Sequence, residues 1–152
     1  MRRLITFVSF MTLMLQISCT KSDTEIVTTP TEPTYDPPKW CVANSSTYEY
    51  SMSAIVMLPS ELQPFENDND ELAIFYKDEC RGTAERIITN LQTSVWMMLI
   101  YGTDSKNDSL CFKYYSSCEK SIYKDNSYFS FEYDKRYGTI DNPIIISLKK
   151  CN

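Results

Sequence analysis

The feature that most constrains this chain is a strict two-residue alternation of apolar side chains where its folded part begins. The apolar members of the alternation are Tyr48, Tyr50, Met52, Ala54, Val56 and Leu58. Polar residues, beginning with Glu49 and Ser51, occupy the positions between them in the first half of the segment. Because successive side chains of a strand point to opposite faces, this spacing predicts a half-buried strand over residues 48–58 that Pro59 ends.

Further short apolar runs follow, most of them separated by turn-forming residues. They cover residues 72–76, 83–89, 94–101, 110–115, 121–123, 128–133 and 144–148. The run at 94–101 is continuously apolar, which predicts a strand covered on both faces. About eight strands at spacings of roughly 8–12 residues, without a convincing amphipathic helix, predict an all-β fold. We expect an antiparallel β-sandwich, immunoglobulin-like or jelly-roll-like, over residues 40–152.

A series of short motifs supports the same architecture by resemblance. In chain order they are Trp40, Tyr48-Glu49-Tyr50-Ser51-Met52, Asn69-Asp70-Glu71-Leu72-Ala73-Ile74-Phe75, Asp78-Glu79-Cys80-Arg81-Gly82-Thr83-Ala84, Leu99-Ile100-Tyr101-Gly102, Phe112-Lys113-Tyr114-Tyr115 and Gly138-Thr139-Ile140-Asp141-Asn142-Pro143-Ile144. Their ordered spacing resembles a small β-sandwich accessory module of Bacteroidota surface and secreted proteins. The resemblance implies a non-catalytic role and transfers no catalytic residue. We expect the module to stand alone here, behind an N-terminal leader.

The first 18 residues have the pattern of a signal peptide. Arg2 and Arg3 precede an uncharged apolar run, residues 4–15, which is short for a membrane span. The following Leu15-Gln16-Ile17-Ser18-Cys19 resembles a bacterial lipobox, which implies cleavage before Cys19 and acylation of that residue. Gln16 stands where the lipobox prefers leucine, so cleavage by the ordinary signal peptidase is the alternative.

Residues 19–39 predict a tether. They are rich in threonine and carry four prolines, a composition that favours extended, semi-stiff chain over a packed core. Acidic residues close behind Cys19, Asp23 and Glu25, resemble the surface-export signal of Bacteroidota lipoproteins. We therefore expect an outer-membrane lipoprotein held at the cell surface by its N-terminal lipid. The periplasmic face is the other placement.

Composition excludes several classes of function. The chain has no histidine, which removes Ser-His-Asp and Cys-His nucleophile pairs and every imidazole metal site. Its three glycines are too scattered for a nucleotide-binding loop. Without residues 1–18, 13 Lys+Arg stand against 20 Asp+Glu, a net charge of −7. Phosphate backbones repel such a surface, so we expect no nucleic-acid partner. We also expect no cofactor.

Five cysteines remain behind Cys19, and an extracytoplasmic location permits disulfides. We expect Cys41–Cys151, which would join the ends of the domain, and Cys111–Cys118, which would close a short turn. The alternative is that all five thiols are reduced and mostly buried. The absence of a C-x-x-C pair argues against zinc, and we expect no metal centre.

An acidic run, residues 66–71, allows two interpretations. Asn and Asp side chains favour turns, so a solvated turn is the ordinary one. Clustered oxygens around Asp68 and Asp70 also suit Ca²⁺, although the run lacks the glycine of an EF-hand loop.

Aromatic residues are the candidate binding groups, because exposed rings stack on sugars and anchor protein contacts. The candidates are Trp40, Tyr115, Tyr123, Tyr128, Tyr133 and Tyr137. Core and cross-strand packing is the usual role of such residues. We expect a non-catalytic module that binds a glycan or an envelope protein. The alternatives are a structural subunit or spacer of a surface assembly, and a hydrolase that uses two of the 20 acidic side chains.

Overall fold

The computed structural model describes residues 34–103 and 109–152, and the fold there is nearly all β. The lipidation candidate Cys19 and the leader lie outside these residues. No helix in the described ranges is long and apolar enough to cross a bilayer. The all-β prediction is confirmed.

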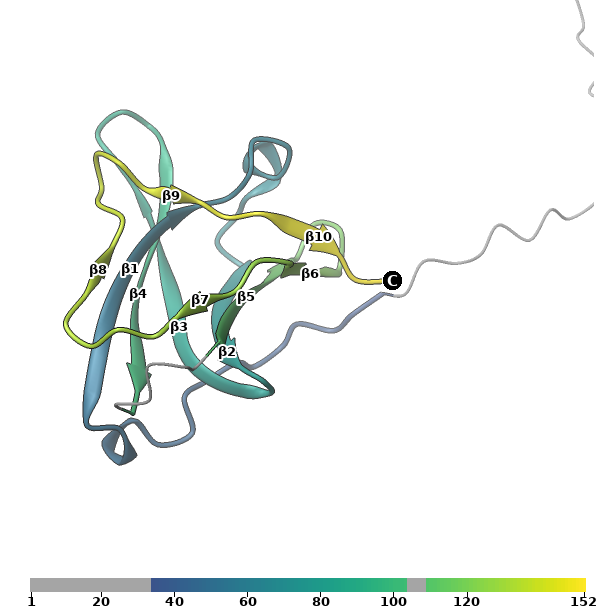
Figure 1. The fold of residues 1–152 in the computed structure, drawn as a ribbon. Coiled ribbons are helices and arrows are strands. Elements are labelled where there is room, and N and C mark those ends of the chain that lie inside the picture. The colour runs from purple at the N-terminus through teal and green to yellow at the C-terminus, as the bar shows by residue number, and fades with distance from the viewer. Residues whose placement is uncertain (1–33, 104–108) are drawn as a thin grey trace, which may run out of the picture. The chain divides into compact units, whose positions relative to one another are not determined.

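Ten strands and two single-turn 3-10 helices form the fold of the residues that the structure describes (Figure 1). The strands are β1 (Tyr50–Met57), β2 (Glu71–Tyr76), β3 (Glu79–Ile88), β4 (Ser94–Gly102), β5 (Ser109–Ser116), β6 (Ser121–Asp125), β7 (Phe129–Ser130), β8 (Arg136–Tyr137), β9 (Ile144–Ile145) and β10 (Leu148–Lys150). The 3-10 helices are η1 (Ser45–Thr47) and η2 (Gln63–Phe65). Each apolar run in the sequence coincides with at least one strand, and β8 is the strand that the sequence did not predict.

The strands form one curled sheet in the order β10-β6-β5-β2-β3-β4-β1-β8. β3 joins its two halves, because its first part pairs with β2 and its second part with β4. Gly82 lies near this change of partner. A Cβ at Gly82 would stand only 2.5 Å from the carbonyl oxygen of Leu99, so a larger residue would push β3 away from β4.

Two C-terminal segments link the far strands of this curled sheet. One runs from β7, which pairs with β5, to β8, which pairs with β1. The other runs from β9 on β1 to β10 on β6. β8 and β9 are parallel to β1, which corrects the antiparallel-only prediction. Two strands must be antiparallel only when a tight hairpin joins them. β8 and β9 reach β1 by crossing from the other half of the sheet, so they can pair with it in parallel.

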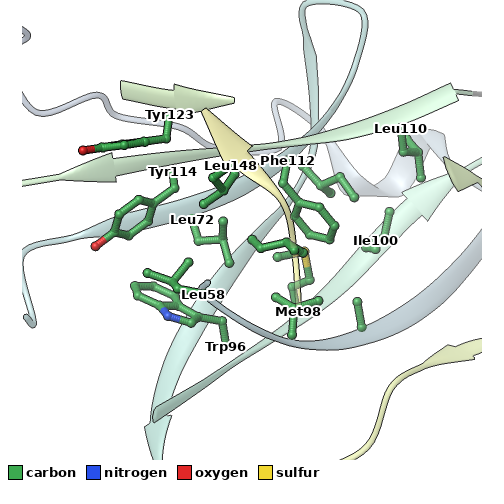
Figure 2. Close-up of a cluster of buried hydrophobic side chains, with 14 of the residues drawn as sticks. Leu58, Leu72, Trp96, Met98, Ile100, Leu110, Phe112, Tyr114, Tyr123 and Leu148 are labelled. Atoms are coloured by element: carbon green, nitrogen blue, oxygen red, sulfur yellow. The ribbon is translucent and has the colours of Figure 1, made fainter. Parts of the chain in front are cut away.

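The main hydrophobic core lies inside the curl (Figure 2). The predicted alternation holds in β1, where Met52, Ala54 and Val56 are buried and the residues between them are half-buried. Tyr48, which precedes the strand, and Tyr50, its first residue, are only half-buried. Aromatic side chains fill much of the volume, with Trp96 and Tyr114 meeting edge to face at a centroid distance of 6.1 Å.

The prediction that residues 94–101 are covered on both faces is wrong for most of the strand. Trp96, Met98 and Ile100 point into the core, whereas Met97 and Leu99 on the outer face are 40% and 45% exposed. Nothing in the described part of the chain lies over these two side chains closely enough to bury them. A continuous apolar run therefore does not by itself show how many faces of a strand are covered.

Candidate binding site

The candidate site lies beside an extended N-terminal segment, residues 34–41, which we call the strap. The amide of Tyr35 donates to the carbonyl of Lys120 at 2.7 Å, and the hydroxyl of Tyr115 donates to the carbonyl of Tyr35 at 3.3 Å. At its other end, Trp40 meets Phe75 edge to face at a centroid distance of 5.6 Å. The strap thus crosses the outer face of β5 and β2, and includes residues that the sequence assigned to the tether.

This cover explains a second hydrophobic cluster on the outer face. Ala73, Phe75 and Cys111 are buried there, with Trp40 and Cys80 packed against them. β2 alternates between the two clusters, since Leu72 and Ile74 belong to the main core. The strap gives β2 the second covered face that β4 lacks.

A cleft of about 340 Å³ opens beside the strap. The strap contributes Lys39, Trp40 and Cys41 to its lining. β2 and β3, with the residue before β2, contribute Asp70, Glu71, Leu72, Thr83 and Ala84. The volume falls within the range of sites for small ligands, and the Trp40 ring is its one aromatic wall. The cleft thus combines an apolar surface with polar groups on both sides.

Three polar side chains of the cleft are available to a ligand. Within the described ranges, the ammonium of Lys39, the carboxylate of Glu71 and the hydroxyl of Thr83 make no hydrogen bond or ion pair with the protein. Lys39 and Thr83 are exposed and Glu71 is half-buried. These groups offer donors and acceptors that a hydroxyl-bearing ligand can match.

Asp70, also in the lining, is already saturated by protein donors. Its carboxylate accepts the hydroxyl of Tyr114 at 2.5 Å, the amide and hydroxyl of Ser117 at 2.8 Å each, and the amide of Asn67 at 3.0 Å. Burial raises the pKa of Tyr114 far above its usual value, and the hydrogen bond to Asp70 raises it further. Asp70 therefore fixes the loop before β2 to the end of β5. It shapes the cleft, but its carboxylate is not available to bind a ligand.

Two more carboxylates of the acidic run, those of Glu66 and Asp68, are also held by protein donors. The guanidinium of Arg86 lies 3.3 Å from the carboxylate of Glu66 and 2.7 Å from that of Asp68. Among the described residues, no group of three or more acidic or cysteine side chains is arranged to hold a metal ion. The geometry therefore agrees with a turn held by its own hydrogen bonds, and Asp68 and Asp70 do not form a shared carboxylate cage.

The five tyrosines predicted to bind do not form one surface. Tyr115 and Tyr123 are buried, and their hydroxyls donate to Tyr35 and Glu119. Tyr137 stacks on Phe129 at 4.8 Å. Only Tyr128 and Tyr133 are more than half exposed, at 61% and 52%. Most of these rings therefore have the packing role that the sequence also allowed.

A second aromatic cluster surrounds Arg81, the extra residue where the register between β2 and β3 shifts. Its guanidinium carbon lies 4.6 Å and 5.2 Å from the ring centroids of Tyr48 and Tyr76. Glu79 pairs with Arg81 at 3.0 Å and accepts the hydroxyl of Tyr48, and the Tyr48 hydrogen bond is the main reason why the pKa of Glu79 is lowered. Because the guanidinium packs against both rings, this cluster is closed packing and not an open platform.

Both predicted disulfides are absent, since all five described cysteines are free thiols. Cys111 lies in β5 and Cys118 in the turn beyond Ser116, so roughly 17 Å of strand separates Cys111 from that turn. Cys151 follows β10, three strand spacings or about 14 Å from β2, where Cys41 lines the cleft. A disulfide needs α-carbons within about 7 Å.

The sequence indicated only one part of this site. Trp40 was a candidate as an aromatic residue, but Lys39 fell in the predicted tether. Glu71 was noted only as the last residue of the acidic run, and Thr83 carried no signal. Long-range pairing alone brings these residues together. No family model, no curated protein and no solved structure matches the chain.

Proposed function

We propose that this protein is a non-catalytic, lipid-anchored surface module that binds a glycan in the cleft beside Trp40. The observation that carries the proposal is the combination of an aromatic wall with three unpaired polar side chains in a cleft of about 340 Å³. A sugar ring presents an apolar face to an indole and a rim of hydroxyls to charged and polar groups. The volume suits the end of an oligosaccharide.

Each side chain has a distinct part in this proposal. Trp40 stacks on the ring, the carboxylate of Glu71 accepts hydroxyl protons, and Lys39 donates to ring or hydroxyl oxygens. Lys39 and Glu71 bear opposite charges, so a neutral sugar suits the cleft better than a strongly anionic one. No bond-breaking step is assigned to these residues.

The proposed location follows from the leader. Acylation of Cys19 anchors the protein in the outer membrane, and the tether lets the domain reach glycans beyond the bilayer. The predicted net charge of −7 disfavours direct adsorption to anionic headgroups. Mass spectrometry of membrane-extracted protein tests this part, because acylated Cys19 and a missing leader are both visible in the mass.

A glycan array probed with the full mature chain tests the binding proposal. We expect selective binding, reduced by at least about tenfold in both Trp40→Ala and Glu71→Gln. Tyr128→Ala removes an exposed ring outside the cleft and should bind like the wild type. Glu71→Gln preserves shape, so it separates lost contacts from lost folding. Equal binding by wild type and both cleft variants, or no binding to any glycan, overturns the proposal.

A second candidate role is that of a subunit or spacer in a surface assembly. It is favoured by the exposed side chains of Met97 and Leu99 on β4, beside a groove of about 370 Å³ that Ser53 and Glu85 also line. Light scattering of the mature chain distinguishes the two roles. Oligomers that dissociate in Leu99→Gln favour assembly, whereas a monomer with sugar affinity favours the glycan module.

A further inference from the structure

We propose that Cys41 and Cys80 form a disulfide in the exported protein, which fastens the strap to β3 beside the cleft. The inference depends on the proposed extracytoplasmic location only for its biological setting, because oxidising compartments are where such bonds persist. The chemistry itself can be tested on the purified chain. In the structure described above, both residues are free thiols.

The position of Cys41 follows from contacts on both of its sides. Its neighbour Trp40 packs on Phe75, and Phe75 is the register partner of Cys80 across β2 and β3. Cys41 also lines the cleft together with Thr83, three residues after Cys80 on the same strand. Trp40 and Cys80 pack against the same outer cluster. The strap therefore delivers Cys41 to the first half of β3.

Electrostatics agree with this placement. Burial is the main reason why the pKa of the Cys80 thiol is raised, and the charge of the Cys41 thiolate adds to the increase. Such an influence falls with distance, so it agrees with a position of Cys41 near Cys80.

The other described cysteines are poorly placed to compete. Phe75 faces Cys80 on one side and Cys111 on the other, so two strand spacings, about 10 Å, separate those two cysteines. That distance exceeds the limit for a disulfide, and paired strands resist the movement needed to shorten it. Cys118 lies in the β5–β6 turn, and Cys151 donates its amide to Ile122 on β6. Cys41, in contrast, belongs to a segment without strand pairing and can adjust.

Exposure sets the order of the reaction. Cys41 is exposed, so its thiolate attacks the disulfide of a small oxidant or an oxidoreductase first. A mixed disulfide forms and the first oxidant thiol leaves. The Cys80 thiolate then attacks the Cys41 sulfur and displaces the second oxidant thiol. Two protein thiols lose two protons and two electrons, and the oxidant disulfide is reduced to two thiols.

Peptide mapping of the full chain after equilibration with reduced and oxidised glutathione tests the proposal. Free thiols are alkylated, and the protein is digested with trypsin without reduction. Lys39, Lys77 and Arg81 are the cleavage points, so the expected bond joins fragment 40–77 to fragment 78–81. We expect this linked pair as the main oxidised product. It should persist in Cys111→Ser and disappear in Cys41→Ser.

Thermal unfolding provides a second measurement. We expect the oxidised wild type to melt at least about 5 °C above its reduced form, with no such difference in Cys80→Ser. Alkylation of both Cys41 and Cys80 under oxidising conditions, or a bond from either to another cysteine, overturns the proposal. Glycan binding is scored separately, so a missing disulfide and a missing ligand are distinct results.

Discussion

The outer faces of the two halves of the sheet differ in one respect that matters for function. Over β2 and β5, the strap buries Ala73, Phe75 and Cys111, so these strands are covered on both faces. On β4, the outward side chains of Met97 and Leu99 remain nearly half exposed. The cleft with Trp40 borders the covered face, and the apolar groove lies on the open one.

The comparison shows that a chain segment without regular structure can determine which part of a sheet is covered on both faces. β2 and β4 are both continuously apolar in sequence, and both are central in the strand order. Periodicity therefore predicts the same environment for both. The difference comes from residues 34–41, which look like a polar linker and are held by a few contacts far apart in sequence.

The largest expected difference between the two outer faces is the loss in the free energy of unfolding when one apolar side chain on each face is truncated. Phe75→Ala removes a ring that is 4% exposed and contacts Trp40 and the ammonium of Lys113, so we expect a loss of about 3–4 kcal/mol in the free energy of unfolding. Leu99→Ala, at 45% exposure, should cost less than about 1 kcal/mol. Urea denaturation measures both. Equal losses would show that the strap does not cover β2 in solution.

The sequence predicted the strands well because their signals are local. Alternation in β1 and the Asn-Asp turn before β2 each act within a few residues. It did not predict β8, because two residues paired to a distant strand leave no periodic pattern. Parallel pairing with β1 was missed for the same reason, since the path between the halves of the sheet depends on the whole fold.

The site was less predictable than the fold. Tyr114 and Tyr115 are adjacent, and alternation indicates only that they face opposite ways. Both are buried, one in the main core and one beneath the strap, which no local pattern reports. The two predicted disulfides failed because pairing by position in the sequence ignores strand order.

The pH dependence of stability at alkaline pH compares a tyrosine in the core with one beneath the strap. Its expected size lies between those of the other two predictions. Burial raises the pKa of Tyr114 and, less strongly, that of Tyr115. A tyrosine whose pKa is raised by folding stays protonated in the folded state at a pH where the unfolded chain already ionises. Its contribution to the free energy of unfolding is therefore fully present below about pH 10 and is lost as the pH rises above that value. Each such group changes the stability by up to about 1.4 kcal/mol per pH unit.

We therefore expect stability to fall between about pH 10 and 11.5 with a slope that Tyr114→Phe reduces clearly. Tyr115→Phe should reduce it less, because the pKa of Tyr115 is raised less strongly. Tyr128→Phe, at 61% exposure, is the control and should leave the slope unchanged. Chemical denaturation at several pH values gives these slopes. Identical slopes in all three variants would contradict the assigned burial of both inner and outer tyrosines.

Peroxide treatment should give the smallest energetic effect and the sharpest comparison within one strand. Met97 and Met98 are neighbours on opposite faces of β4, with 40% and 4% exposure. Oxidation to the sulfoxide follows access, so Met97 should gain an oxygen well before Met98. The change in unfolding free energy should stay below about 0.5 kcal/mol, because the altered thioether already contacts water. Fragment mass spectra distinguish the two sites. Protection of Met97 in whole cells but not in the purified chain would show that a partner covers the open face, whereas rapid oxidation in both settings would show that Met97 stays open to solvent.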